Sequence, residues 1–88
     1  NEEWEDIRQT VDGRYDKFSV RLLEAFPGLS MKDVYFCCLV KINVSIKDLS
    51  DIYCISRTSI SRKKLRMKRD KLGLTENNET LDDFLRRF

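Results

Sequence analysis

The sequence predicts an all-α fold, a small helical bundle containing a helix-turn-helix, with an additional N-terminal helix that is one long helix or two short ones. Three observations predict it. Apolar residues recur every three or four positions, as they do on one face of a helix. Ser or Thr with Asp three residues later precedes several of these segments, a pattern typical of helix starts. A chain of 88 residues, 41% hydrophobic and 36% charged, suits one soluble helical domain.

The first predicted helical segment runs from Glu2 to Phe26. Gly13 is its weak point, so a break there and an unbroken helix are both open. The Pro-Gly pair at residues 27–28 ends the segment. We therefore divide the chain into an N-terminal helical linker or brace, residues 1–28, and a helix-turn-helix domain, residues 29–88. The apolar stripe of the first segment either packs on that domain or joins a dimeric linker, and it consists of Trp4, Ile7, Val11, Tyr15, Phe18, Leu22 and Ala25 or Phe26.

Two shorter helices are expected next. Ser30 is placed as an N-cap, with Asp33 completing a capping box, and the apolar run from Val34 to Val40 forms a central core helix. Ser45 and Asp48 repeat the arrangement before a second, shorter helix. The apolar residues expected on one face of this short helix are Leu49, Ile52 and Tyr53.

A longer basic helix is expected from Arg57 to Lys71. Residues 54–55 form a tight connection before it, Ser56 is its N-cap, and Gly73 ends it. A polar loop follows at residues 75–79. A last helix comes after the loop, and the residues that cap it or form its apolar stripe are Thr80, Asp83, Leu81, Phe84, Leu85 and Phe88.

Positive charge is concentrated in the basic helix. Residues 57–71 contain eight basic residues and one acid, a net charge of +7, whereas the rest of the chain has nine basic and fourteen acidic residues, a net charge of −5. Such a patch attracts a polyanion. A short helix, a connection of about three residues and a longer basic helix also make up the helix-turn-helix, whose second helix lies in the DNA major groove. The sequence therefore predicts double-stranded DNA as the partner and residues 29–88 as a DNA-binding domain.

The basic helix has two predicted faces. At about 100° per residue, Ile60 and Met67 point inward and the opposite side faces DNA. Residues near the helix start reach deepest into the groove, so base contacts are assigned to Arg57, Thr58, Ser61 and Arg62, with Leu65 available for a thymine methyl group. Phosphate contacts are assigned to Lys47, Lys63, Lys64, Arg66, Lys68 and Arg69, with Lys32 as a further candidate.

The stretch from Leu29 to Gly73 resembles the LuxR/FixJ-type (GerE-like) helix-turn-helix, whose pattern is roughly LTxxExxVLxLLxxGxSxKEIAxxLxISxxTVxxHxxxIxxKLG. It is somewhat more similar to a variant, of the form ISxxSIxRxxxRxxxKL, found at the C-terminus of sensor-linked transcription regulators. The resemblance implies a four-helix domain that binds DNA as a homodimer, follows an N-terminal sensor or signalling region, and often places its last helix at the dimer contact. The matching positions are Leu29, Ser30, Leu39, Val40, Ser45, Lys47, Asp48, Leu49, Ile55, Ser56, Ser59, Ile60, Met67, Lys71, Leu72 and Gly73.

The chain also departs from the family pattern. Asn43 and Cys54 stand where the family has glycine, Ser50 replaces a frequent alanine, and Lys63 replaces a frequent histidine. A left-handed turn is less comfortable for cysteine than for glycine. One extra residue also lies between Met67 and the Leu-Gly pair at the end of the basic helix.

Other function classes receive less support. No nucleophile-base pair or phosphate-binding glycine loop indicates an enzyme, and no cofactor or metal is expected in a chain without histidine. Cys37, Cys38 and Cys54 are expected to be small buried apolar residues, because three cysteines do not form an even set of disulfides. No run is long enough for a membrane span, and the acidic start is unlike a secretory signal, so the expected compartment is the cytoplasm.

Two alternative functions are kept open. A promoter-recognising region of an alternative sigma factor shares the helix-turn-helix, although the extra helices at both ends argue against it. A protein-interaction or anionic membrane-surface module would use the basic helix to dock an acidic partner or lipid. Its weakness is the lack of an apolar face on that helix.

Overall fold

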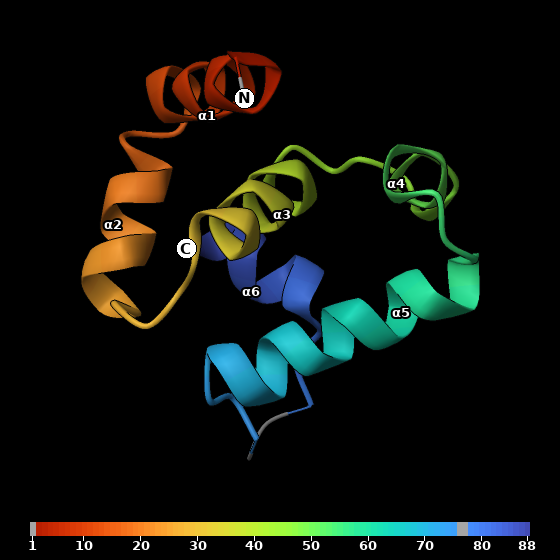
Figure 1. Cartoon of the computed structure of the whole chain (residues 1–88). Coiled ribbons are helices and arrows are strands. Elements are labelled where there is room, and N and C mark those ends of the chain that lie inside the picture. Colours follow the sequence, from red (N-terminus) through yellow and green to blue (C-terminus); the bar gives the residue numbers. More distant parts are fainter. Residues whose placement is uncertain (1, 76–77) are drawn as a thin grey trace.

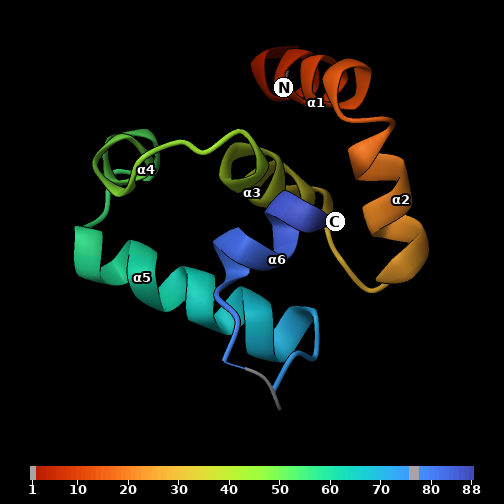
Figure 2. The ribbon, with the colours of Figure 1, turned by 180° about the vertical axis from the view of Figure 1, so that it is seen from behind.

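The computed structural model describes residues 2–75 and 78–88, and every regular element in these ranges is helical. Figures 1 and 2 show α3 at the centre, α1 and α2 along one side, and α6 between α3 and α5. The predicted all-α bundle is therefore confirmed. No helix in these ranges is long and apolar enough to cross a membrane. The elements are α1 (Glu2–Arg14), α2 (Phe18–Ala25), α3 (Met31–Lys41), α4 (Ile46–Tyr53), α5 (Arg57–Arg66), a π-helical turn (Met67–Lys71) and α6 (Leu81–Arg87).

Four helices begin at the side-chain caps that the sequence predicts. The Ser30 hydroxyl accepts from the Asp33 N–H at 3.2 Å, and the Asp33 carboxylate accepts from the Ser30 N–H at 3.0 Å, which completes the capping box of α3. Ser45, Ser56 and Thr80 each accept from the N–H three residues later at 3.1 Å. Each cap contributes about 1 kcal/mol, so the starts of α3, α4, α5 and α6 are encoded locally. Residues 76–77 of the predicted loop before α6 lie outside the described residues.

The N-terminal segment forms two helices, and they are not separated at Gly13. Gly13 lies inside α1, while the left-handed residues Asp16 (φ 53°) and Lys17 (φ 57°) separate α1 from α2. Asp12 explains this position of the break. Its carboxylate accepts from the Ser19 N–H at 2.7 Å and from the Ser19 hydroxyl at 2.5 Å, and it thereby caps the start of α2 from the end of α1.

The hydrophobic core is built around α3. Five consecutive residues of this helix, from Phe36 to Val40, are buried, which is the central core helix that the sequence predicts. The other helices each turn apolar side chains toward it. The buried residues that they contribute are Val11, Phe18, Leu22, Leu49, Ile60, Met67, Leu81, Phe84 and Leu85.

The aromatic side chains of the N-terminal stripe pack within the chain. Trp4 stacks on Tyr35 of α3, with 5.5 Å between ring centroids, and lies 6.0 Å from the Tyr53 ring of α4. At the other end of the stripe, the rings of Phe18 and Phe26 lie against the ring of Phe88, with 6.1 Å and 6.3 Å between the ring centroids. Aromatic pairs of this kind contribute about 1 kcal/mol beyond their burial, so α1 and α2 are held on the core.

The last helix is anchored in the same region. Lys41 donates to the carbonyl oxygens of Leu85 and Arg86 at 2.8 Å and 2.9 Å, and Arg21 donates to that of Phe88. These cations satisfy the carbonyl groups that any helix leaves unpaired at its C-terminal end. The apolar stripe of α6 consequently packs on the core of its own chain.

Two expectations about burial are wrong. Cys37 and Cys38 are buried, but Cys54 is exposed, because it occupies the left-handed position that ends α4 and lies in the turn outside the core. In α4, Leu49 is buried and Tyr53 half-buried, whereas Ile52 is 46% exposed. A helix of eight residues presents only a narrow stripe to the core, and Ile52 falls beside that stripe.

Candidate nucleic-acid interface

The turn between α4 and α5 consists of Cys54, Ile55 and Ser56. Cys54 has φ 55° and ψ 42°, the left-handed conformation that commonly ends a helix. Ser50 closes the turn with two hydrogen bonds, because its carbonyl accepts from the Ile55 N–H at 3.2 Å and its hydroxyl donates to the Ile55 carbonyl at 2.5 Å. These bonds fix the start of α5 relative to α4 and complete a helix-turn-helix.

The basic helix has one buried and one exposed face. Ile60 is fully buried and Met67 is 4% exposed, which confirms the predicted inward ridge. On the opposite side, Leu65 is 50% exposed. We call this side, together with the exposed first residue of the helix, the outer face of α5. Its exposed residues are Arg57, Thr58, Ser61, Arg62, Leu65, Arg66 and Arg69.

A π-helical turn at Met67–Lys71 accounts for the extra residue noted in the sequence. The Leu72 N–H donates to the Met67 carbonyl at 3.0 Å, a bond that spans five residues where an α-helical bond spans four. In an uninterrupted α-helix, Leu72 would lie about 140° around the axis from Met67. The π turn absorbs one residue and returns Leu72 to the inner side, where it is 5% exposed. The helix then ends at Gly73, which has φ 68°.

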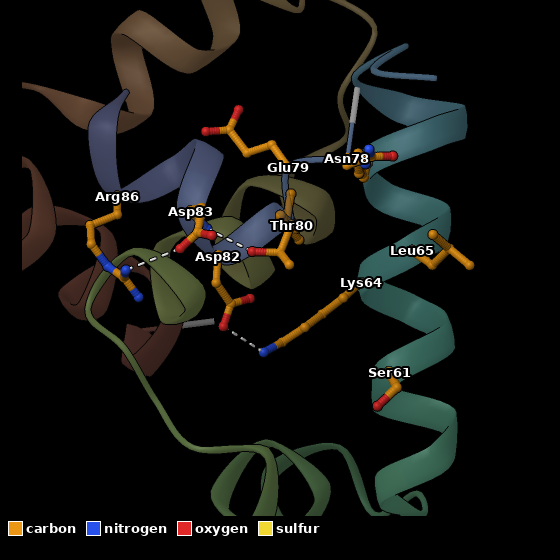
Figure 3. A pocket seen from close by; sticks show the side chains of 11 residues that line it. Ser61, Lys64, Leu65, Asn78, Glu79, Thr80, Asp82, Asp83 and Arg86 are labelled. Atoms are coloured by element: carbon orange, nitrogen blue, oxygen red, sulfur yellow. Dashed lines mark hydrogen bonds and ion pairs between the residues drawn. The ribbon is translucent and has the colours of Figure 1, made fainter. Parts of the chain in front are cut away.

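On one flank of the outer face, α5 approaches the start of α6. Lys64 Nζ donates to the Asp82 carboxylate at 3.0 Å and crosses the space between the two helices (Figure 3). A cleft of about 610 Å³ lies here, with Ser61 and Leu65 on the α5 side. The opposite side of the cleft carries three carboxylates, and besides Asp82 these are Glu79 and Asp83, which pair with Arg87 and Arg86.

On the other flank, α5 lies against α3 and α4. Lys63 Nζ is 5.0 Å from the centre of the Phe36 ring and 4.9 Å from that of Tyr53. The two rings meet edge to face, with 5.7 Å between their centroids. Burial raises the pKa of Tyr53 to about 12, so its ring stays neutral beside the lysine. Further along, Lys71 pairs with Asp33 at 3.6 Å.

The predicted site residues therefore fall into two groups. All five residues assigned to bases are exposed on the outer face, and so are Arg66 and Arg69 among those assigned to phosphates. Lys47 is exposed near the start of α4, and Lys32 near the start of α3. Lys63, Lys64 and Lys68 are half-buried on the flanks. The structure brings the first group together on one surface and turns Lys63 and Lys64 toward neighbouring helices.

Three contributions to this surface were missed by reasoning from the sequence. Ser50 fixes the turn, yet both of its bonds use partners that a sequence pattern does not reveal. The carboxylates across the cleft, at the start of α6 and just before it, lie about 20 positions away in the chain. The inward direction of Lys63 follows from two aromatic rings on two other helices. The only sequence signal for this inward direction was that Lys63 stands where the family pattern often has histidine.

The outer face has the chemistry of an anion-binding surface. It carries four arginines, whose planar guanidinium groups match phosphate oxygens and guanine edges, together with two hydroxyls and one apolar side chain. Among residues 2–75 and 78–88, no group of three or more acidic, cysteine or histidine side chains is placed to hold a metal. We compared the chain with models of known protein families, with curated proteins and with solved structures, and none of these comparisons found a match.

Proposed function

We propose that this chain is a sequence-specific double-stranded DNA-binding module that serves, without enzymatic activity, as the output domain of a transcription regulator. The outer face of α5 carries the proposal. It is exposed along its length and cationic, and it follows directly on the three-residue turn after α4. A helix so presented is the part that a helix-turn-helix inserts into the major groove.

The dimensions fit this role. Residues 57–71 form a continuous helical rod of about 22 Å at 1.5 Å per residue. The major groove is about 12 Å wide and accepts one helix. The start of α5 enters first, so Arg57, Thr58, Ser61 and Arg62 read base edges, and Leu65 contacts a thymine methyl group.

The residues predicted to contact phosphates differ in whether they are free to reach DNA or already contact other helices. Arg66 and Arg69 lie on the exposed side of α5, and Lys47 lies near the start of the preceding helix, where a groove-bound helix-turn-helix meets the DNA backbone. Lys63 and Lys64 already contact other parts of the chain. We therefore place the phosphate contacts of this module on Lys47, Arg66 and Arg69.

The charge distribution supports an oriented approach to DNA. The basic helix lies at one end of the molecule and α1, with exposed acids at Glu3 and Asp6, at the other (Figures 1 and 2). A polyanion is attracted to the first end and repelled by the second. Two copies on neighbouring half-sites, each joined through α1 to a sensor or signalling region, complete the proposed regulator.

The experiment selects preferred sequences from a pool of random duplexes and then titrates salt. Arg62→Ala should relax the preference at one base pair by about 1–3 kcal/mol, whereas Arg66→Ala should weaken all duplexes alike and reduce the salt slope by about 0.9. Arg14→Ala is the matched control, because it removes an exposed arginine from α1 at the far end of the molecule. Binding weaker than millimolar at low salt, or unchanged binding in both α5 variants, contradicts the proposal.

A further inference from the structure

Two adjacent lysines of α5 contact other helices of the chain. The Lys63 ammonium lies over the rings of Phe36, from α3, and Tyr53, from α4, at 5.0 Å and 4.9 Å. Phe36 is fully buried, so Lys63 is drawn toward the core side of α5. The two rings meet edge to face and both attract the cation, so they restrict the position of the Lys63 ammonium group.

The neighbouring Lys64 contacts the opposite side. Its ammonium pairs with Asp82 of α6 at 3.0 Å, and only 15% of its side chain is exposed. Figure 3 shows the lysine extended from α5 across to the acid. Asp82 is 34% exposed, so solvent screens this pair less than a fully exposed ion pair but does not leave it buried.

Neighbouring residues point about 100° apart on a helix, so these two contacts hold α5 from two directions. The burial of Ile60 and Met67 opposes a large rotation of α5 about its axis, and contacts on its two flanks define the smaller rotation that remains. We infer that Lys63 and Lys64 are positioning residues, which set that rotation so that Arg62 and the rest of the outer face point at the bases. This inference rests on the proposed function and removes both lysines from the set of phosphate contacts.

The two roles predict different effects on binding. A phosphate contact supplies affinity to every duplex and contributes about 0.9 to the salt slope. A positioning residue contributes nothing to that slope, and its loss lowers the preference for the selected duplex over a random one. The ratio of these two affinities and the salt slope therefore distinguish the roles.

For Lys63, the test compares Lys63→Met with Lys63→Arg. Methionine keeps most of the length without the charge, and arginine keeps a cation above the two rings. We expect Lys63→Met to lower the preference for the selected duplex about fivefold with an unchanged salt slope, and Lys63→Arg to restore the preference. A slope that falls by about 0.9 with an unchanged preference assigns Lys63 to a phosphate and overturns the inference.

For Lys64, the test exchanges the charges of the pair. Lys64→Glu should lower the preference several-fold, and adding Asp82→Lys should restore it, because the ion pair is rebuilt in the opposite sense. Lys64→Glu combined with Glu24→Lys, an exposed position on α2, is the control, since it has the same net charge without the rebuilt pair. Equal recovery in the two double variants means that net charge alone matters, and this overturns the role of Lys64.

Urea denaturation of the same variants gives a readout that needs no DNA. The Lys64–Asp82 pair should show a coupling of about two- to fivefold in the unfolding equilibrium constant. No coupling shows that the contact does not hold α5 in place. If the unaltered chain binds no duplex while the coupling is present, the proposed function fails and the lysines retain only a structural role. If the unaltered chain binds a selected duplex and the lysine variants behave as phosphate contacts, this inference fails while the proposed function stands.

Discussion

Deleting Asp70 tests how the π-helical turn places the end of the basic helix. The turn contains one residue more than an α-helical turn, and Asp70 is an exposed residue within it. Without Asp70, Leu72 becomes the fourth residue after Met67, and four residues cover about 400°, which returns it to nearly the same side. Both side chains then stay buried in a regular α-helix.

The expected cost of this deletion is small. No buried apolar group is lost, and a regular α-helical hydrogen bond replaces the π-type bond from Leu72 to Met67, so the free energy of unfolding should change by less than about 1 kcal/mol. Deleting Arg62 from the regular part of α5 is the control. It rotates every later residue by about 100° and removes Met67 and Leu72 from the core. Each of these two side chains contributes about 2 kcal/mol or more when buried, so the free energy of unfolding of this control should fall by at least about 4 kcal/mol.

Urea denaturation measures the free energy of unfolding of both variants. Unfolding is monitored by far-UV circular dichroism and by the fluorescence of the single tryptophan, Trp4. The two deletions should differ by about 3 kcal/mol or more in the free energy of unfolding. If deleting Asp70 destabilises the chain as much as deleting Arg62, the extra residue is not absorbed by the π turn and the assignment of faces beyond Met67 is wrong.

The other predictions concern single side chains. In the native chain, a thiol reagent should react rapidly with exposed Cys54 alone and slowly with buried Cys37 and Cys38, and Cys54→Ser should abolish the rapid phase. Burial raises the pKa of Cys38 to about 12, which slows its reaction further. Cys54→Gly should raise the free energy of unfolding by about 1 kcal/mol in a urea titration, because glycine adopts φ 55° without strain; a loss of stability would refute this. A hydrogen bond from Arg8 lowers the pKa of Glu5 below its usual value of 4.5. The stabilisation that the ionised Glu5 carboxylate provides is therefore complete above pH 4.5 and is lost as the pH falls through the lowered pKa. Glu5→Gln should therefore lower the melting temperature at neutral pH but not at about pH 2, and an equal effect at both pH values would contradict this sign.

Local signals allowed most helix starts to be predicted from the sequence. The caps at Ser30, Ser45, Ser56 and Thr80 each use a bond to a residue three positions away, so a short pattern contains all the information needed. The inward ridge of α5 was predicted for the same reason. Helical periodicity places Ile60 and Met67 on one side regardless of what they contact.

Features that depend on distant residues were not predictable in this way. The break between α1 and α2 lies after Gly13 because Asp12 bonds to Ser19, seven positions later. The directions of Lys63 and Lys64 depend on side chains from three other helices. Charge alone assigned both lysines to phosphates, whereas packing turns them inward. The exposure of the outer face was therefore predictable from helical periodicity, whereas the directions of the lysines on its flanks were not.

Mapping of NMR shifts on the selected duplex tests the central claim most directly. We expect the largest changes at the outer face of α5, at Thr58, Ser61, Arg62 and Leu65, with smaller changes near Lys47 and none on α1. Replacing guanine by 7-deazaguanine, which removes a major-groove acceptor, should weaken binding of the unaltered chain but not of the Arg62→Ala variant. Shifts confined to α1, α2 or α6, or indifference to the modified base, would show that α5 does not enter the major groove.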